Sequence, residues 1–224
     1  EAHEKKVRLF IDAEESWIQQ PIDDLANEMM KKYNVEEPIV YNTFQMYLIR
    51  KEADLRAAFQ MAVRYRYYLG VKLVRGAYME KERERAEEKG YPDPVQPTKE
   101  KTDLAFDRGL KFCVQNQQRV ALCAGTHNEY SSFYLTVLMN KFNIKPENPN
   151  FFFAQLYGMS DHISFNLSSQ GYNVAKYVPY GPLKSVMPYL FRRAEENTSV
   201  AGQSGREYTL VKRELQRRRK QQTA

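Results

Sequence analysis

Two adjacent arginines near the end of the sequence, Arg192 and Arg193, are well suited to hold an anion. Together with Tyr189 and Glu196 they follow the spacing i, i+3, i+4 and i+7, which places all four on one face of a helix. Two guanidinium groups beside a ring can grip a carboxylate through bidentate hydrogen bonds, while Glu196 could balance their charge or meet an ammonium. The same spacing also fits a solvated face on which Arg192 pairs with Glu196, so both interpretations stay open.

A second candidate is the segment VKLVRGAY at residues 71–78, in which a short apolar run leads into a Gly-Ala turn. Lys72 and Arg75 would suit a phosphate or an electron-rich ring. Gly76 would let a flat ligand approach the backbone closely, because glycine has no side chain to block it. The alternative is an ordinary strand with charged residues at its edges.

Three hydrogen-bonding side chains, Thr126, His127 and Asn128, follow another apolar run. A lone histidine is more often a structural donor than a catalyst. The other histidines, His3 and His162, are distant in sequence, so we expect no histidine-based metal site.

Acidic residues gather at positions 12–15, where Asp12 is followed by Glu14 and Glu15. Such a group could supply an acid/base pair for catalysis. It could equally be a cluster of acids that the dipole favours in the first turn of a helix.

The elements that must position these residues alternate between strand and helix. Short β-branched or aromatic runs predict buried strands at 7–11, 39–44, 71–74, 119–123, 151–155 and 174–178. Helical segments are expected at 21–33, 51–69, 98–117, 128–142, 160–170 and 183–197. Pro21 is expected in the first turn of its helix, and Gly70 is expected to close the helix before the third strand. This alternation predicts an α/β fold with a parallel sheet.

A (βα)8 barrel is favoured over an open doubly wound sheet. No G-x-G-x-x-G fingerprint and no Walker loop occur among the ten glycines. A barrel should gather functional side chains where its strands end. Polar and aromatic residues do follow the six predicted strands: Asp12; Gln45; Arg75 with Tyr78; Thr126, His127 and Asn128; Gln155 with Tyr157; Tyr177 with Tyr180. Ordinary polar loop starts would give a similar pattern. Only about six βα units are evident, so two are missing at the N-terminus or another segment supplies them.

Composition narrows the class of protein further. A chain of 224 residues with 42% hydrophobic and 13% aromatic residues can fold as one large domain or two small ones and is not intrinsically disordered. Two cysteines exclude a disulfide scaffold, and every apolar run is far shorter than the ~20 residues that span a bilayer. The sequence opens EAHEKK, so we expect no targeting segment within it.

The net charge of +6 lies mostly in the tail, because residues 206–224 carry seven basic and two acidic side chains. We therefore expect two regions, a barrel over residues 1–200 and a basic, helical tail over residues 201–224. A solvated basic helix is favoured over one that docks to a membrane or to nucleic acid.

Several of these motifs together resemble the proline dehydrogenase family. They are LVRGAY at 73–78, THN at 126–128, LYGM at 156–159, KYVPYGP at 176–182 and YLFRRAEEN at 189–197, with FIDAEE at 10–15 and YNTFQMY at 41–47. The match runs in order over residues 7–200. The sequences of these motifs are most similar to those of the mitochondrial animal branch, and so are GYPDP at 90–94 and the basic tail.

The resemblance implies a distorted (βα)8 barrel that binds FAD without a covalent link. In this family proline loses a hydride from the ring carbon beside nitrogen to flavin N5, which gives Δ1-pyrroline-5-carboxylate. The reduced flavin then passes electrons to ubiquinone on the matrix side of the inner mitochondrial membrane, where the basic tail could support peripheral association. The resemblance implies no nucleic-acid partner and no metal.

The resemblance also assigns residues to roles. Arg192 and Arg193 would grip the carboxylate of proline, and Asp12 and Glu196 would orient the charged groups. The pocket over the flavin would be shaped by Tyr189, Tyr177, Tyr78 and Leu156. The flavin and the rest of FAD would be held by Gln45, Lys72, Val74, Arg75, Gly76, Ala77, Thr126, His127 and Asn128. The bacterial branch has arginine at the position of Lys72. The lysine of this sequence keeps a hydrogen-bond donor there but lacks the planar guanidinium group of arginine.

Two other functions remain open. Hydroxyproline dehydrogenase shares the fold and cofactor, but that branch has a smaller residue at the position of Tyr177. A catalytically silent protein that binds through its basic tail is a different class. The family also carries site residues on two further strands, including a lysine on the second strand, and nothing before Glu1 supplies them. The chain therefore resembles the C-terminal six units of the barrel.

Overall fold

A computed structural model describes residues 1–184, 186–191 and 203–222 of the chain. These residues belong to two compact units, Glu1–Gln155 with Ile163–Ala175, and Leu156–His162 with Lys176–Ala224. Three predicted site residues, Arg192, Arg193 and Glu196, lie outside the described residues. The division at residue 200 between a barrel and a tail stays a prediction.

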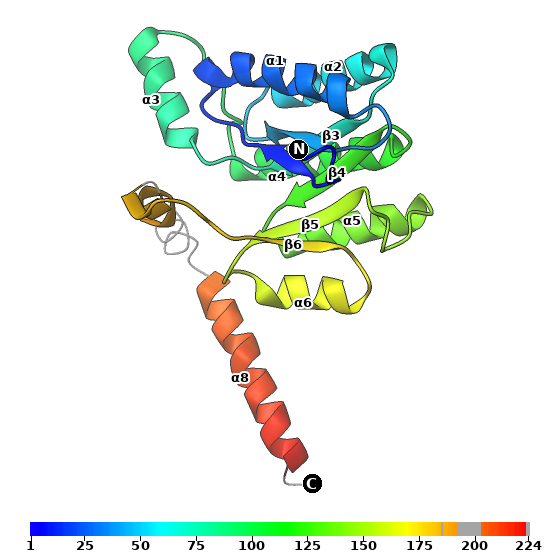
Figure 1. Cartoon of the computed structure of the whole chain (residues 1–224). Helices are drawn as coiled ribbons and strands as arrows, with labels where there is room; N and C mark the ends of the chain where they lie inside the picture. Colours follow the sequence, from blue (N-terminus) through cyan, green and yellow to red (C-terminus); the bar gives the residue numbers. More distant parts are fainter. Residues whose placement is uncertain (185, 192–202, 223–224) are drawn as a thin grey trace. The chain divides into compact units, whose positions relative to one another are not determined.

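The sheet has six strands, which lie side by side in the order of the chain (Figure 1). Neighbouring strands from β1 to β5 pair in parallel, so each connection crosses over through helical segments. The bounds are β1 Leu9–Ile11, β2 Val40–Gln45, β3 Leu69–Val74, β4 Val120–Gly125, β5 Phe151–Leu156 and β6 Val174–Tyr177. All six predicted strands are confirmed, and the fold is α/β with six parallel βα units of a barrel.

Helices fill the connections between these strands. Their bounds are α1 Ser16–Tyr33, α2 Lys51–Tyr65, α3 Met79–Lys89, α4 Lys99–Gln115, α5 Glu129–Lys141, α6 Asp161–Ser169 and α8 Gln203–Gln222. Residues 183–184 and 186–191 are also helical. Helix α3 was not predicted because it is polar on almost every face, with only Glu82 and Ala86 buried. Among the described helices, none is long and apolar enough to cross a membrane.

Two sequence expectations about helix ends are wrong. Helix α1 starts at Ser16, so Pro21 lies inside the helix and not in its first turn. The early start has a tertiary cause, because the backbone N–H and the hydroxyl of Ser16 both donate to the carboxylate of Glu82, at 2.6 Å each. The residues near Ser16 in the sequence give no sign of this contact, because Glu82 is 66 positions away.

The end of helix α2 is the second correction. The helix ends at Tyr65, and Arg66 takes the left-handed conformation with φ 60° that closes it. Gly70 lies inside β3 instead. A Cβ at that position would lie 2.2 Å from the carbonyl oxygen of Val40, so the glycine permits close contact between strands.

The strands alternate between two faces. On β2, Phe44 packs with the main core among the helices, while Thr43 pairs in register with Lys72 of β3 and Lys72 with Cys123 of β4. Residues in register on parallel strands share a face. The inner face of the sheet therefore carries Thr43, Lys72 and Cys123, and the row after it carries Gln45, Val74, Gly125 and Ala154.

Candidate cofactor and substrate site at the strand ends

The inner face brings Lys72 of β3 and Asp12, just after β1, into an ion pair. Lys72 is 20% exposed and Asp12 56% exposed. An ammonium group carries three N–H donors, and the contact with Asp12 uses one of them. The two residues are 60 positions apart in sequence, and the order of the strands is what brings them together.

Beyond Gln45, the inner-face residues at the strand ends form a nearly flat surface. Val74, Gly125 and Ala154 follow one another across β3, β4 and β5, and two of the three have no side chain beyond Cβ. A Cβ on Gly125 would lie 3.0 Å from Cγ1 of Val74, so a larger residue could not be added without movement. A flat row beside a partly paired ammonium fits a planar ring that carries hydrogen-bond acceptors, such as the isoalloxazine of FAD.

Gln45 and Tyr78 both bind the loop that follows β1. The amide of Gln45 donates to the backbone oxygen of Glu14 at 2.7 Å, and the hydroxyl of Tyr78 donates to the carboxylate of Glu14 at 2.7 Å. From the sequence, Glu14 was expected either in a catalytic acid/base pair or in an acidic first turn of a helix, but α1 begins at Ser16 and has no acidic residue in its first turn. The structure makes it the common partner of two predicted site residues.

Arg75 joins four elements through its guanidinium group. It donates from Nε to Asp103 of α4 at 2.5 Å, from Nη1 to Thr126 at 2.7 Å and from Nη2 to Ser131 of α5 at 2.9 Å. Its guanidinium carbon lies 4.4 Å from the ring centre of Phe106. All three nitrogens therefore bond to the protein, which points to a role in fixing β3 against β4, α4 and α5.

Two carboxyl groups beside Arg75 have pKa values displaced in opposite directions. Burial tends to raise the pKa of Asp103, but hydrogen bonds from Lys99 and Arg75 outweigh it and leave that pKa below its ordinary value. Burial raises the pKa of Asp107, against the hydrogen bond from Ser131. Asp103 and Ser131 were missed from the sequence because they lie 28 and 56 positions from Arg75.

Gly76 has a structural reason to be glycine. Its φ is 124°, and a Cβ there would lie 1.7 Å from Cδ1 of Tyr47, whose ring is fully buried. Burial raises the pKa of the Tyr47 hydroxyl, and the nearby carboxylate of Glu82 raises it further. The expected approach of a ligand to Gly76 stays a prediction, as does the role of Ala77 beside it.

The Thr-His-Asn segment organises the start of α5. Oγ1 of Thr126 accepts from Arg75 and from the backbone N–H of Asn128 at 3.1 Å. The side chain of Asn128 caps α5 by accepting from the N–H of Ser131 at 3.0 Å. His127 between them is half-buried. Thr126 and Asn128 thus hold the backbone at the end of β4.

In the second unit, two of the tyrosines predicted for the substrate pocket are neighbours. The ring centres of Tyr177 and Tyr189 lie 5.6 Å apart at an angle of 55°. Tyr177 is 44% exposed, and its backbone oxygen accepts from the N–H of Tyr157 at 2.9 Å. Leu156 ends β5 on the less buried side of that strand. Beside them Lys176 pairs with Asp161 at 2.7 Å.

Two further features of the described residues bear on other possible sites. A cavity of about 500 Å³ lies between α1, α2 and residues 92–94, away from the strand ends. We give it less weight than the strand ends as a catalytic site, because the predicted site residues do not line it. Within the described segments, no group of three His, Cys, Asp or Glu side chains could hold a metal ion. Burial raises the pKa of the inner-face Cys123 thiol to about 12.

Parallel strands in chain order, with polar side chains at their carboxyl ends, define the class of (βα)8-barrel enzymes. A family model described as proline dehydrogenase matches residues 1–206, and the chain belongs to the proline dehydrogenase family.

Curated relatives agree with that family. The chain is 41% identical over 220 residues to proline dehydrogenase 1, mitochondrial, of Homo sapiens, covering 97% of this chain and 37% of that protein. It is 40% identical over 222 residues to proline dehydrogenase 1, mitochondrial, of Drosophila melanogaster (95% and 33%). It is also 40% identical over 217 residues to a hydroxyproline dehydrogenase of Xenopus laevis (95% and 47%). The chain thus spans about a third to a half of these relatives.

A solved structure agrees in fold. Proline utilization A (PutA) of Bdellovibrio bacteriovorus superposes with a TM-score of 0.82 at 28% identity, covering 88% of this chain and 20% of that one. The six βα units therefore correspond to part of a barrel that is known in the family.

Proposed function

We propose that the protein to which this chain belongs is an FAD-dependent oxidoreductase that converts proline to Δ1-pyrroline-5-carboxylate. The observation that carries the proposal is the Asp12–Lys72 ion pair beside the flat row of Val74, Gly125 and Ala154 on the inner face. Family membership supplies the substrate class. Because the chain spans a third to a half of its relatives, the activity of the whole protein is a proposal and not an observation.

The chain's own residues would bind, orient and enclose the reactants. FAD, when bound, supplies flavin N5 as the hydride acceptor. Lys72 would donate to the ring, and Gln45, Val74, Arg75, Gly76, Ala77, Thr126, His127 and Asn128 would hold the cofactor directly or through the backbone. Asp12 would keep the ammonium of Lys72 oriented.

The substrate would be held by its carboxylate. In this proposal Arg192 and Arg193 grip that group, Glu196 balances their charge, and Tyr177, Tyr189, Tyr78 and Leu156 enclose the ring. The amine of proline must be neutral before the hydride leaves the adjacent carbon, since its lone pair forms the new C=N bond. The reaction removes one hydride from carbon and one proton from nitrogen, and fixing the carboxylate makes the position of the reacting carbon reproducible.

The destination of the electrons is proposed from the relatives. Those of Homo sapiens and Drosophila melanogaster are named as mitochondrial, so we propose the matrix side of the inner mitochondrial membrane, with ubiquinone as acceptor. The basic residues of α8, among them Lys212 and Arg219, would contact the membrane surface. No nucleic-acid partner is proposed.

A matched pair of lysines tests the flavin site. Lys72 and Lys176 are both strand lysines paired with an aspartate, and they are 20% and 23% exposed. Lys72→Met should weaken FAD binding about 10- to 100-fold through loss of a charge-assisted hydrogen bond, while Lys176→Met should leave it within about 2-fold. The measurement is an FAD titration followed by visible absorbance. Equal affinity in both variants, or no FAD binding by the unmodified full-length protein, would refute the proposal.

A hydroxyproline dehydrogenase is the second candidate. It is favoured by the 40% identity to the Xenopus laevis protein of that name, which equals the identity to the Drosophila melanogaster proline dehydrogenase and is close to the 41% of the human one. Tyr177 separates the two candidates, because its ring would crowd a substituent on the proline ring.

A further inference from the structure

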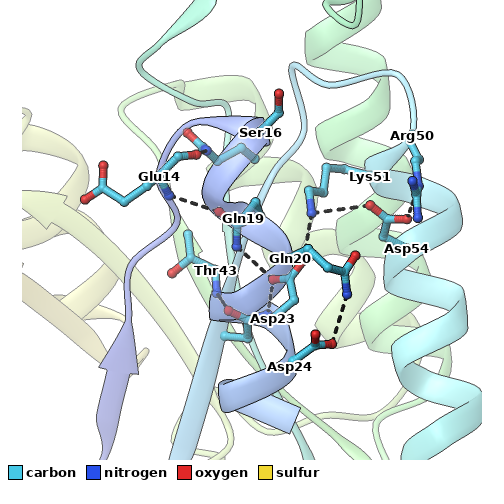
Figure 2. Close-up of polar contacts among 12 residues, drawn as sticks. Glu14, Ser16, Gln19, Gln20, Asp23, Asp24, Thr43, Arg50, Lys51 and Asp54 are labelled. Carbon is cyan, nitrogen blue, oxygen red and sulfur yellow. Dashed lines mark hydrogen bonds and ion pairs between the residues drawn. The ribbon is translucent and has the colours of Figure 1, made fainter. Parts of the chain in front are cut away.

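A set of four polar side chains, three buried and one half-buried, joins helix α1, strand β2 and helix α2. Gln19 of α1 is 3% exposed and donates from Nε2 to Oδ1 of Asp23 at 2.7 Å (Figure 2). The same oxygen of Asp23 accepts from Asn42 of β2 at 2.7 Å, and its other oxygen lies 3.2 Å from Nζ of Lys51 of α2. We call Gln19, Asp23, Asn42 and Lys51 the brace.

The brace holds its geometry through these polar contacts. Lys51 is 5% exposed and pairs also with Asp54 at 3.3 Å. A buried ammonium persists only where it is paired, and loss of one partner leaves a charge without compensation. Gln19, Asp23 and Lys51 border the cavity between α1 and α2, so tight packing does not confine them on that side. The hydrogen bonds and ion pairs hold these three side chains in place instead.

One end of the brace reaches the candidate flavin site. Oε1 of Gln19 accepts from the backbone N–H of Glu14 at 3.0 Å, as Figure 2 shows. The other polar groups of Glu14 bind Gln45 and Tyr78, each at 2.7 Å. Asp12, the partner of Lys72, stands two residues earlier in the same loop. A shift at Gln19 would therefore reach Asp12, Gln45 and Tyr78 through this single loop.

We propose that Gln19 and Asp23 are positioning residues, which set the place of the loop 12–15 and through it the Asp12–Lys72 pair at the flavin. The part of the proposal that concerns flavin rests on the proposed function. The part that concerns the loop does not, because it follows from contacts among the described residues alone.

The same helix offers a matched control. Gln20 donates from Nε2 to Oδ1 of Asp24 at 2.9 Å, with the same residue types and the same spacing as Gln19 and Asp23. This second pair is exposed, and Figure 2 shows it pointing away from Glu14. If a Gln–Asp pair served only to stabilise helix α1, substitutions in the two pairs would have the same effect on the loop.

The first experiment measures the loop directly. Amide hydrogen exchange of residues 12–15 is compared among Gln19→Leu, Asp23→Asn, Gln20→Leu and Asp24→Asn. Loss of the acceptor for the Glu14 N–H in Gln19→Leu, and of the carboxylate partner of Lys51 in Asp23→Asn, should speed exchange in the loop about 2- to 10-fold, while the last two variants should leave it unchanged. Unchanged exchange in both brace variants, or equal acceleration in the controls, would overturn the proposal.

A double variant that exchanges donor and acceptor between positions 19 and 23 distinguishes loss of this hydrogen bond from general unfolding of the protein. Gln19→Glu sets two carboxylates against each other and should loosen the loop. Addition of Asp23→Asn lets an amide at position 23 donate to a carboxylate at position 19, which can still accept from Glu14. Exchange of residues 12–15 should then be slower than in Gln19→Glu alone but not fully restored, because an asparagine at position 23 cannot both accept from Asn42 and pair with Lys51. A double variant as loose as Gln19→Glu alone would count against positioning.

The second experiment asks whether the loop serves the flavin. Gln19→Leu should weaken FAD affinity about 2- to 10-fold and shift the visible flavin spectrum, while Gln20→Leu should change neither. A loosened loop with unchanged affinity and spectrum would overturn the link to the flavin. Absence of FAD binding by the unmodified protein would refute the proposed function, and hydrogen exchange would still decide whether the brace positions the loop.

Discussion

At the scale of single residues, we propose that Tyr177 sets the preference between proline and hydroxyproline. Its ring is 44% exposed and lies 5.6 Å from the ring of Tyr189. A ring at the end of a barrel strand lies where ligands bind in this architecture. A hydroxyl group on the substrate would compete with the ring for that space, whereas an unsubstituted proline would pack against it.

Tyr177→Ser should therefore change substrate preference. The unmodified enzyme is expected to favour proline over 4-hydroxyproline by about 5- to 150-fold in kcat/KM, because overpacking costs roughly 1–3 kcal/mol. The variant should reduce that ratio and also weaken activity on proline through lost packing. The measurement is kcat/KM for both substrates in both proteins. An unchanged ratio would mean that Tyr177 only fills space, and an initial preference for hydroxyproline would favour the sister enzyme.

Gly76 gives a prediction about stability. Gly76→Ala forces a Cβ into the ring of Tyr47 at a φ of 124°, so the free energy of unfolding should fall by about 2–4 kcal/mol. Gly90→Ala is the control, since Gly90 has a φ of 70° and no atom within 4 Å of the added Cβ. It should cost only about 1–2 kcal/mol. Urea unfolding of both variants measures the difference, and equal losses would show that the Tyr47 ring is not the cause.

At the scale of elements, Arg75 and two aspartates hold β3, β4, α4 and α5 together. Helix α4 contributes both Asp103 and Asp107, whose pKa values are displaced in opposite directions, downward by hydrogen bonds from Lys99 and Arg75 and upward by burial. A carboxyl group with a lowered folded pKa stabilises the fold above its unfolded pKa, and that stability is lost as pH falls through the folded pKa. A raised pKa has the reverse sign.

The two aspartates should consequently respond differently to substitution. At pH 7, Asp103→Asn should lower the free energy of unfolding by about 1 kcal/mol, and the loss should vanish as pH falls below 3.8 and through the lowered pKa of Asp103. Asp107→Asn should leave stability at pH 7 equal or higher, because its charged form is the disfavoured one. Urea unfolding across this pH range gives both curves, and parallel losses in the two variants would contradict the assignment.

At the scale of the whole molecule, the ends of the sheet are the conspicuous feature. Among the described strands, β1 pairs with β2 on one side only and carries the exposed Leu9 and Phe10. Strand β6 is the other end of the order. Unpaired strand edges with apolar side chains tend to pair with other chains.

The 224-residue polypeptide by itself should therefore self-associate and show little or no proline oxidation. The measurement is size-exclusion chromatography with light scattering, together with an activity assay after addition of FAD. Leu9→Lys, which puts a charge beside the open edge, should reduce association. A monomer with robust turnover would show that six βα units suffice and that the lysine expected on a further strand is not needed.

Most of the fold and part of the candidate site could be predicted from the sequence. The six strands were found because each is a short apolar run, and strand order followed from the alternation with helices. Helix α3 was not predicted because it is polar on almost every face, and the start of α1 was not because Glu82, which caps Ser16, is 66 positions away in sequence. The role of Gly70 was also not predictable from the sequence, because a glycine is required there by close contact with the neighbouring strand and not by the end of a helix.

The sequence by itself determined the motifs at the strand ends, since residue type and position along a strand are local properties. Tertiary structure alone decided what those residues bind. Arg75, whose role toward the cofactor stays a proposal, is the centre of an ion-pair and hydrogen-bond cluster, and Gln19 is a partner of the loop at Glu14. Contacts such as these join residues from different strands and helices. The sequence does not show them because their geometry depends on the packing of the whole sheet and its helices.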